Sequence, residues 1–136
     1  MILEFLDFEF AEARKTEEGI PKMPKGINTN IDITDAELKN NILNLRFTYR
    51  ARYIPEEHYI RIDGIARFKG PEVKTAYDEW RKTRRITGIA GEQVINAINY
   101  SSSINSVFIA RVFNLTPPLV PPIIKFEEPV REKSKR

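Results

Sequence analysis

The sequence contains no cysteine, a single histidine, and no apolar run as long as a membrane-spanning helix requires. Without cysteine the chain cannot form disulfides, use a thiol nucleophile, or bind zinc or an iron–sulfur cluster through thiolates. Its first residues lack the basic start of a secretory signal peptide, and acidic residues interrupt their apolar part. We therefore expect a cytoplasmic protein.

Patterns typical of catalysis are also missing. The one histidine, His58, has no base partner at a useful spacing, and we interpret it as a solvated turn residue. The glycines do not have the spacing of a phosphate-binding loop. The sequence thus predicts a protein that is not an enzyme and that uses no metal and no cofactor.

Length and charge set further bounds. The chain has 136 residues, 41% of them hydrophobic, which suits one domain with a modest core. A net charge of +3 is too mild to indicate nucleic-acid binding by itself. We expect a single domain over residues 1–126, followed by a charged and disordered tail over residues 127–136.

The strongest local pattern lies in residues 43–69. Large apolar or aromatic side chains alternate with polar ones from Leu43 to Tyr53, and a second alternating run follows from Tyr59 to Lys69. This period of two is that of a strand with one buried face. The break between the runs contains Pro55, which suits a turn. The pattern predicts an antiparallel hairpin that the other elements cover or extend.

The remaining elements follow in order. Residues 2–13 alternate as a first strand, residues 14–30 form a connection broken by prolines, and a further strand starts at Ile31, with a polar interruption over residues 35–41. Helical spacing appears over residues 72–86 and 89–116, and prolines make residues 119–126 extended. The expected fold is α+β, with an antiparallel sheet of about four strands, a central hairpin, and C-terminal helices covering it.

The second helix is apolar on nearly every side, with small polar residues at its centre. A helix of this kind is buried on several sides, which one thin domain does not provide. We therefore expect a homo-oligomer, a dimer or a tetramer, with the interface at Ile98, Ser102, Asn105, Ile109 and Val112.

Arginines gather on the polar face of the hairpin, at positions 46, 50, 52, 61 and 67. One interpretation is a basic stripe for RNA, with Tyr59 as a stacking residue. The other, which we favour, is pairing with acidic residues of the first strand, namely Glu4, Asp7 and Glu9. An RNA-binding sheet more typically exposes aromatic residues beside its arginines, whereas the aromatic residues of the stretch 43–53 alternate onto the opposite face.

Apolar residues also occur where a single core does not need them. One core together with an oligomer interface explains most of this surplus. The functional interpretation is a groove for extended apolar peptides, formed where the loop over residues 14–30 and the second helix meet. The residues predicted to bind a client are Phe8, Phe10, Ile20, Met23, Ile27, Leu119 and Val120.

The order of elements resembles that of the protein-export chaperone SecB and its SecB-like relatives. The resemblance is carried by Asp7-Phe8-Glu9-Phe10, by residues 30–33 followed by 43–51, by the segment 88–93 before the helix, and by residues 113–117 and 119–123. It implies a tetramer, a dimer of dimers, that holds unfolded chains in surface grooves. The helix over residues 72–86 is an insertion relative to the bacterial protein. The tail lacks the acidic character that serves docking on the export motor there.

Three functions follow as hypotheses. The first is an ATP-independent holdase-type chaperone that binds non-native polypeptides in apolar grooves. The second is a non-enzymatic adaptor that uses the same surface for one folded partner. The third is an RNA-binding sheet. No motif identifies the client, or assigns the chain to export, to a toxin–antitoxin pair or to general folding.

Overall fold

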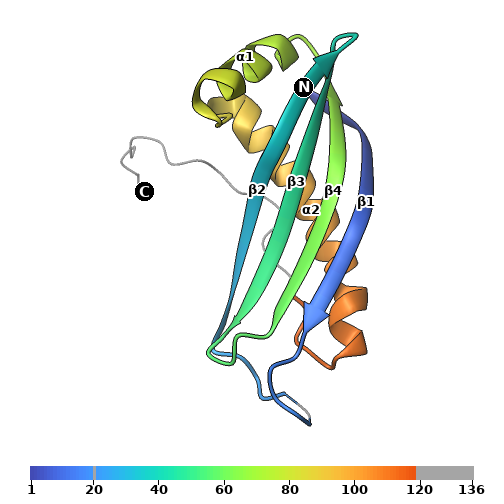
Figure 1. Cartoon of the computed structure of the whole chain (residues 1–136), viewed down its shortest axis with the longest axis vertical. Helices are drawn as coiled ribbons and strands as arrows, with labels where there is room; N and C mark the ends of the chain where they lie inside the picture. Colours follow the sequence, from blue (N-terminus) through green and yellow to red (C-terminus); the bar gives the residue numbers. More distant parts are fainter. Residues whose placement is uncertain (20, 119–136) are drawn as a thin grey trace, which may run out of the picture.

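The computed structural model describes residues 1–19 and 21–118. The described elements are β1 (Ile2–Arg14), β2 (Gly26–Lys39), β3 (Ile42–Ile54), β4 (Tyr59–Lys69), α1 (Val73–Thr83) and α2 (Gly88–Val112). The strands form one open antiparallel sheet in the order β1-β4-β3-β2, and both helices follow it in the chain (Figure 1). The predicted α+β fold with a central hairpin, β3–β4, is confirmed.

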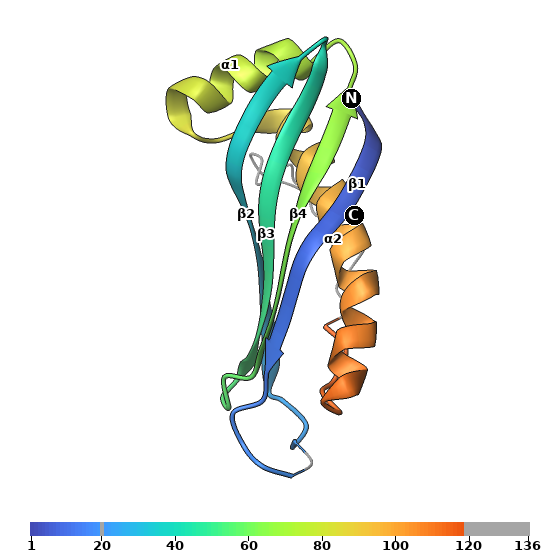
Figure 2. The ribbon, with the colours of Figure 1, turned by 45° about the vertical axis from the view of Figure 1, so that its right-hand side comes forward.

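The two faces of the sheet differ sharply. Every second residue of β3 from Leu43 to Tyr53 is buried, and Ile60, Ile62, Ala66 and Phe68 of β4 continue the same inner face. α2 runs along this inner face, as Figure 2 shows, while no described helix lies on the outer face. α1 packs near the β2 edge through Val73, Ala76 and Trp80. The core therefore lies between the sheet and the helices.

The hairpin between β2 and β3 was not expected from the sequence. β2 extends to Lys39, and Asn40 and Asn41 make the turn with φ of 54° and 61°. Two consecutive residues at positive φ are typical of a two-residue turn whose twist matches that of its strands, and asparagine tolerates this conformation. The predicted interruption at residues 35–41 is in part a register shift between Ile33 and Asp35. Residues 36–39 continue β2 and pair with β3, and residues 40 and 41 form the turn.

The connection from β1 to β2 passes the turn of the central hairpin, because β1 and β2 lie at opposite edges of the sheet. Here the interpretation of His58 as a solvated residue is wrong, since the side chain is only 2% exposed. Its Nδ1 accepts a hydrogen bond from the Thr16 backbone N–H at 3.0 Å, and its ring lies edge-on to Tyr53. Thr16 Oγ1 also donates to the Glu56 carbonyl. His58 thus fastens the connection to the hairpin.

β1 contains a bulge that changes which side chains face the core. The register passes from Phe8 opposite Gly64 to Phe10 opposite Asp63, so one extra residue stands in β1 between them. Phe8 packs edge-on against the Phe47 ring on the inner face, with ring centroids 6.4 Å apart. Phe10 faces outward and is 46% exposed. Its predicted place on the same face as Phe8 is therefore wrong.

The second helix ends earlier than expected. It stops at Val112, and Asn114 then takes a left-handed conformation with φ of 59°. The chain turns back there, since the Leu115 N–H donates to the Ala110 carbonyl and the Tyr53 hydroxyl donates to the Thr116 carbonyl. The extended segment and the tail predicted for residues 119–136 lie outside the described residues.

Candidate functional site

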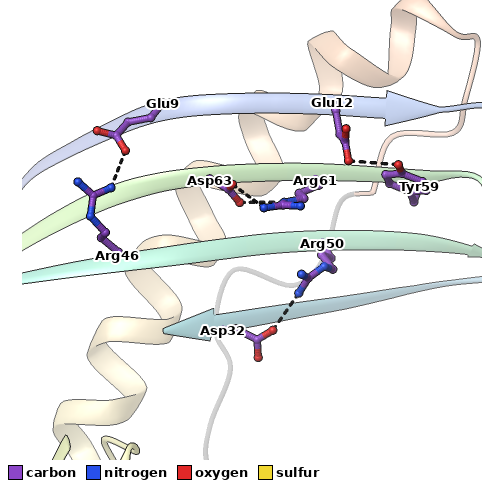
Figure 3. Close-up of polar contacts among 8 residues, drawn as sticks. All are labelled: Glu9, Glu12, Asp32, Arg46, Arg50, Tyr59, Arg61 and Asp63. Carbon is purple, nitrogen blue, oxygen red and sulfur yellow. Dashed lines mark hydrogen bonds and ion pairs between the residues drawn. The ribbon is translucent and has the colours of Figure 1, made fainter. Parts of the chain in front are cut away.

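The outer face of the sheet carries a ladder of ion pairs (Figure 3). Arg46 of β3 reaches Glu9 of β1 across β4, with Nη1 and Oε1 2.7 Å apart. Arg50 of β3 pairs with Asp32 of β2 at 2.9 Å. The sequence-based prediction that acidic residues pair with these arginines is confirmed for Arg46 and Glu9. Most of these groups are about half exposed, so each pair contributes about 0–1 kcal/mol.

A third pair lies within β4. Arg61 donates from Nε and Nη2 to both carboxylate oxygens of Asp63, at 3.1 and 2.9 Å. These hydrogen bonds are the main reason why the pKa of Asp63 is lowered from its ordinary value and that of Arg61 is raised. Beside them, the Tyr59 hydroxyl donates to Glu12 of β1 at 3.1 Å. The charges of the ladder largely neutralise one another.

Aromatic rings do share the outer face with the arginines. The Arg61 guanidinium lies 5.4 Å from the centre of the Phe10 ring, and that of Arg67 lies 4.7 Å from the centre of the Phe5 ring. The argument against RNA from the placement of aromatic residues is therefore wrong for β1. The argument from ion pairing carries more weight, because a phosphate would have to displace carboxylates from Arg46, Arg50 and Arg61.

The predicted client-binding residues are not brought together. Phe8 is partly buried on the inner face, and Phe10 lies on the outer face. Ile27 belongs to β2 rather than to a loop, and it packs against the core. Met23 is 80% exposed, and the Thr116 hydroxyl donates to its sulfur at 3.8 Å. The prediction for Ile27 is corrected accordingly, and the groove is not formed by these described residues.

The other predicted members of that groove, Ile20, Leu119 and Val120, lie outside the described residues.

The predicted interface residues of α2 divide into two groups. Ile98 and Ser102 are fully buried within the chain, so they offer no surface to a second subunit, and the prediction is corrected for them. Ile109 is partly buried against the core. Asn105 and Val112 lie at the surface, where the interface remains a prediction.

The side of α2 that faces the sheet carries buried apolar residues in its first half and mostly small polar residues in its second half. Ser102, Ser103 and Ser106 are buried there, and the Ser106 hydroxyl donates to the Ser103 carbonyl at 2.7 Å. Tyr49 and Tyr53 occupy the facing part of the sheet, and burial raises the pKa of both phenols. Large tyrosine rings opposite serines fill the layer next to this part of α2, and four bulky residues of the helix point away from the sheet.

Those residues form what we call the α2 row, made of Tyr100, Ile104, Phe108 and Val112. Their exposed fractions are 56%, 41%, 67% and 73%. Since residues four apart are neighbours on a helix, they make one ridge about 18 Å long at 1.5 Å per residue. Sequence reasoning missed this row as a unit, although a regular spacing of four was the signal. Four of the nine large hydrophobic side chains that are exposed among the described residues lie in it.

Comparison with known proteins adds no assignment: no protein family, curated protein or solved structure matches this chain. Neither α1 nor α2 has the length and apolar character needed to cross a membrane. Within the described ranges, no three or more acidic or histidine side chains are grouped as metal ligands would be. The functional argument therefore rests on the exposed surfaces themselves.

Proposed function

We propose that this protein is an ATP-independent, holdase-type chaperone of the SecB-like kind, and that the α2 row binds apolar segments of non-native polypeptides. The observation that carries the proposal is the exposure of four large apolar side chains in one line. Contiguous exposed apolar surface on a chain of this size marks an interaction site. The sequence resemblance to SecB supports the same function.

The dimensions of the row suit such a client. An extended chain advances about 3.3–3.6 Å per residue, so a row of about 18 Å matches roughly five or six client residues. Each apolar side chain that a client buries contributes about 1.5–3 kcal/mol before the cost of ordering the chain. A few such contacts give weak and broad binding, and several copies acting on one client would strengthen it.

A second candidate function is that of an adaptor for one folded partner. The spacing of the row favours it, because a ridge of residues four apart is the surface that packs into the groove of another helix in the commonest class of helix packing. A second copy of this chain presents the same ridge, so the predicted self-association uses the same chemistry.

The test is a double variant, Ile104→Ser with Phe108→Ser, compared with Ile89→Ser. Ile89 is 75% exposed on the same helix but lies outside the row, which makes it a matched control. We expect the double variant to stay folded by circular dichroism and to lose most of its ability to suppress aggregation of a heated client. The Ile89 variant should retain it.

Sedimentation of the same proteins separates the alternatives. Lost suppression with an unchanged oligomeric state places the client on the row, whereas lost suppression with dissociation makes the row an interface on which activity depends. Full suppression by the double variant would refute the proposal. A single tight partner in a pull-down, together with no suppression by the unmodified protein, would favour the adaptor.

A further inference from the structure

A hollow of about 600 Å³ lies between the edge of the sheet and the end of α1. We call it the edge groove. One wall is residues 30–33 of β2, the opposite wall is Trp80 with residues 84–87, and Ile95 of α2 adds an apolar contact. In Figures 1 and 2, α1 lies beside β2. Because α1 supplies one wall, the groove exists only through the helix that the sequence analysis interprets as an insertion.

The β2 wall offers backbone groups. β2 is an outer strand and is hydrogen-bonded to β3 alone among the described strands. The N–H and C=O groups on its other side therefore have no strand partner within the described part of the chain, and an added strand could pair with them. Extended peptides bind such edges by continuing the sheet, with alternate side chains entering the neighbouring hollow. Ile31 and Ile33 are partly buried and pack against the core, which gives this stretch of β2 a firm base.

The α1 wall offers positive charge. Arg84 ends α1 in a left-handed conformation, with φ of 61°, and its N–H donates to the Trp80 carbonyl at 2.7 Å. This turn lays the Arg84 guanidinium 4.3 Å from the centre of the indole ring. No carboxylate among residues 1–19 and 21–118 forms an ion pair with Arg84 or Arg85. Asp32, which also lines the groove, is already paired with Arg50.

We propose that the edge groove binds an extended peptide segment that carries an acidic side chain. The segment pairs with the free edge of β2, places apolar side chains against Ile31, Ile33 and Ile95, and sets its carboxylate at Arg84 and Arg85. This site is separate from the α2 row, and the proposal does not depend on the holdase function. The free strand edge favours a peptide over a nucleic acid, because only a polypeptide backbone can complete the hydrogen-bond ladder.

The first measurement uses a synthetic peptide, acetyl-TVEVEVT-amide, with a fluorescein label and anisotropy detection. A matched peptide has lysine in place of both glutamates. We expect saturable binding of the acidic peptide and at least tenfold weaker binding of the basic one. Trp80 is the only tryptophan of the chain, so its fluorescence reports occupancy of the groove without a label. Hydrogen exchange at residues 30–33 should slow when the acidic peptide is bound.

The second measurement uses two variants with the same change in charge. Arg84→Gln with Arg85→Gln removes both cations from the groove and should weaken binding at least tenfold. Arg81→Gln with Lys82→Gln alters the last turn of α1 outside the groove and should leave the affinity unchanged.

Any of three results would overturn the proposal. They are equal binding of the acidic and basic peptides, no saturable binding of the acidic peptide, and unchanged affinity in the Arg84 and Arg85 variant. If a twelve-residue thymidine oligonucleotide binds through these arginines and the peptide does not, the groove belongs to nucleic acid instead. Suppression of client aggregation is measured separately, so failure of the holdase proposal does not affect this test.

Discussion

Gly64 of β4 is a position where a single added methyl group would collide with its neighbours. A Cβ at this residue would lie 2.4 Å from the Asp7 backbone oxygen and 2.8 Å from Cζ of Phe47. An ordinary contact between carbon and oxygen is about 3.3–3.6 Å. The bulged part of β1 would therefore have to move by about 1 Å, and the Phe47 ring would have to leave its packing against Phe8.

The net cost of Gly64→Ala follows from three contributions. Overpacking a buried site costs about 1–3 kcal/mol, and losing the edge-on ring pair costs about 0.5–1.5 kcal/mol. Replacing glycine within a strand returns about 0.5–1 kcal/mol through the lower entropy of the unfolded chain. We expect a loss of about 1–3 kcal/mol in the free energy of unfolding, measured by urea denaturation with circular dichroism.

Gly26→Ala is the matched control for this variant. No atom lies within 4 Å of a Cβ built at Gly26, and its φ is not positive, so alanine there should be neutral or stabilising by up to about 1 kcal/mol. Equal stability of the two variants would refute the close packing described for β1, β4 and Phe47.

Two further outcomes are expected. Asp63→Asn should cost about 0.5–1 kcal/mol at pH 7, because the ion pair with Arg61 is partly exposed. The folded-state pKa of Asp63 is lowered, so its contribution to stability is complete above the unfolded pKa of about 3.9. That contribution disappears as the pH falls through the folded-state pKa. The stability difference between the unmodified protein and Asp63→Asn should therefore be smaller at pH 2.5 than at pH 7. Met23→Ser should change the free energy of unfolding by less than about 0.5 kcal/mol, whereas Ile27→Ser should lower it by about 1–3 kcal/mol. Urea denaturation measures both, and equal stability of the two variants would contradict the packing of Ile27 against the core.

The sequence predicted the centre of the sheet because its side chains alternate without interruption. From Leu43 to Tyr53 a single phase holds for the whole of β3, and the inner face is buried throughout. β1 and β2 were harder, because each contains a register shift that changes the phase. A two-residue step from Phe8 to Phe10 normally keeps one face, and the bulge between them turns the second ring outward. The bulge meets Gly64 on another strand, so it cannot be inferred from β1 alone.

The candidate surface on α2 was only partly predictable, for a different reason. The helix is apolar on many sides, so its sequence does not state which side meets the sheet. In the folded chain, the size of the side chains on the sheet decides which side of α2 faces it. Tyr49 and Tyr53 fill the space beneath the sheet, so serines face inward while Tyr100 and Phe108 point out. The usual expectation that the bulkiest residues lie inside selects the wrong side of this helix.

The exposed surfaces are of three kinds, which differ in the contacts that each could still make with a partner. The outer face of the sheet pairs most of its arginines with carboxylates of the chain itself, so it has little left to offer an anionic partner. Among residues 1–19 and 21–118, nothing covers the α2 row, no carboxylate pairs with Arg84 or Arg85, and no strand pairs with the outer edge of β2. An apolar client would cover the α2 row, whereas an acidic peptide would pair with β2 and with Arg84 and Arg85. Variants at Phe108 and at Arg84 should therefore impair one binding activity each and leave the other intact.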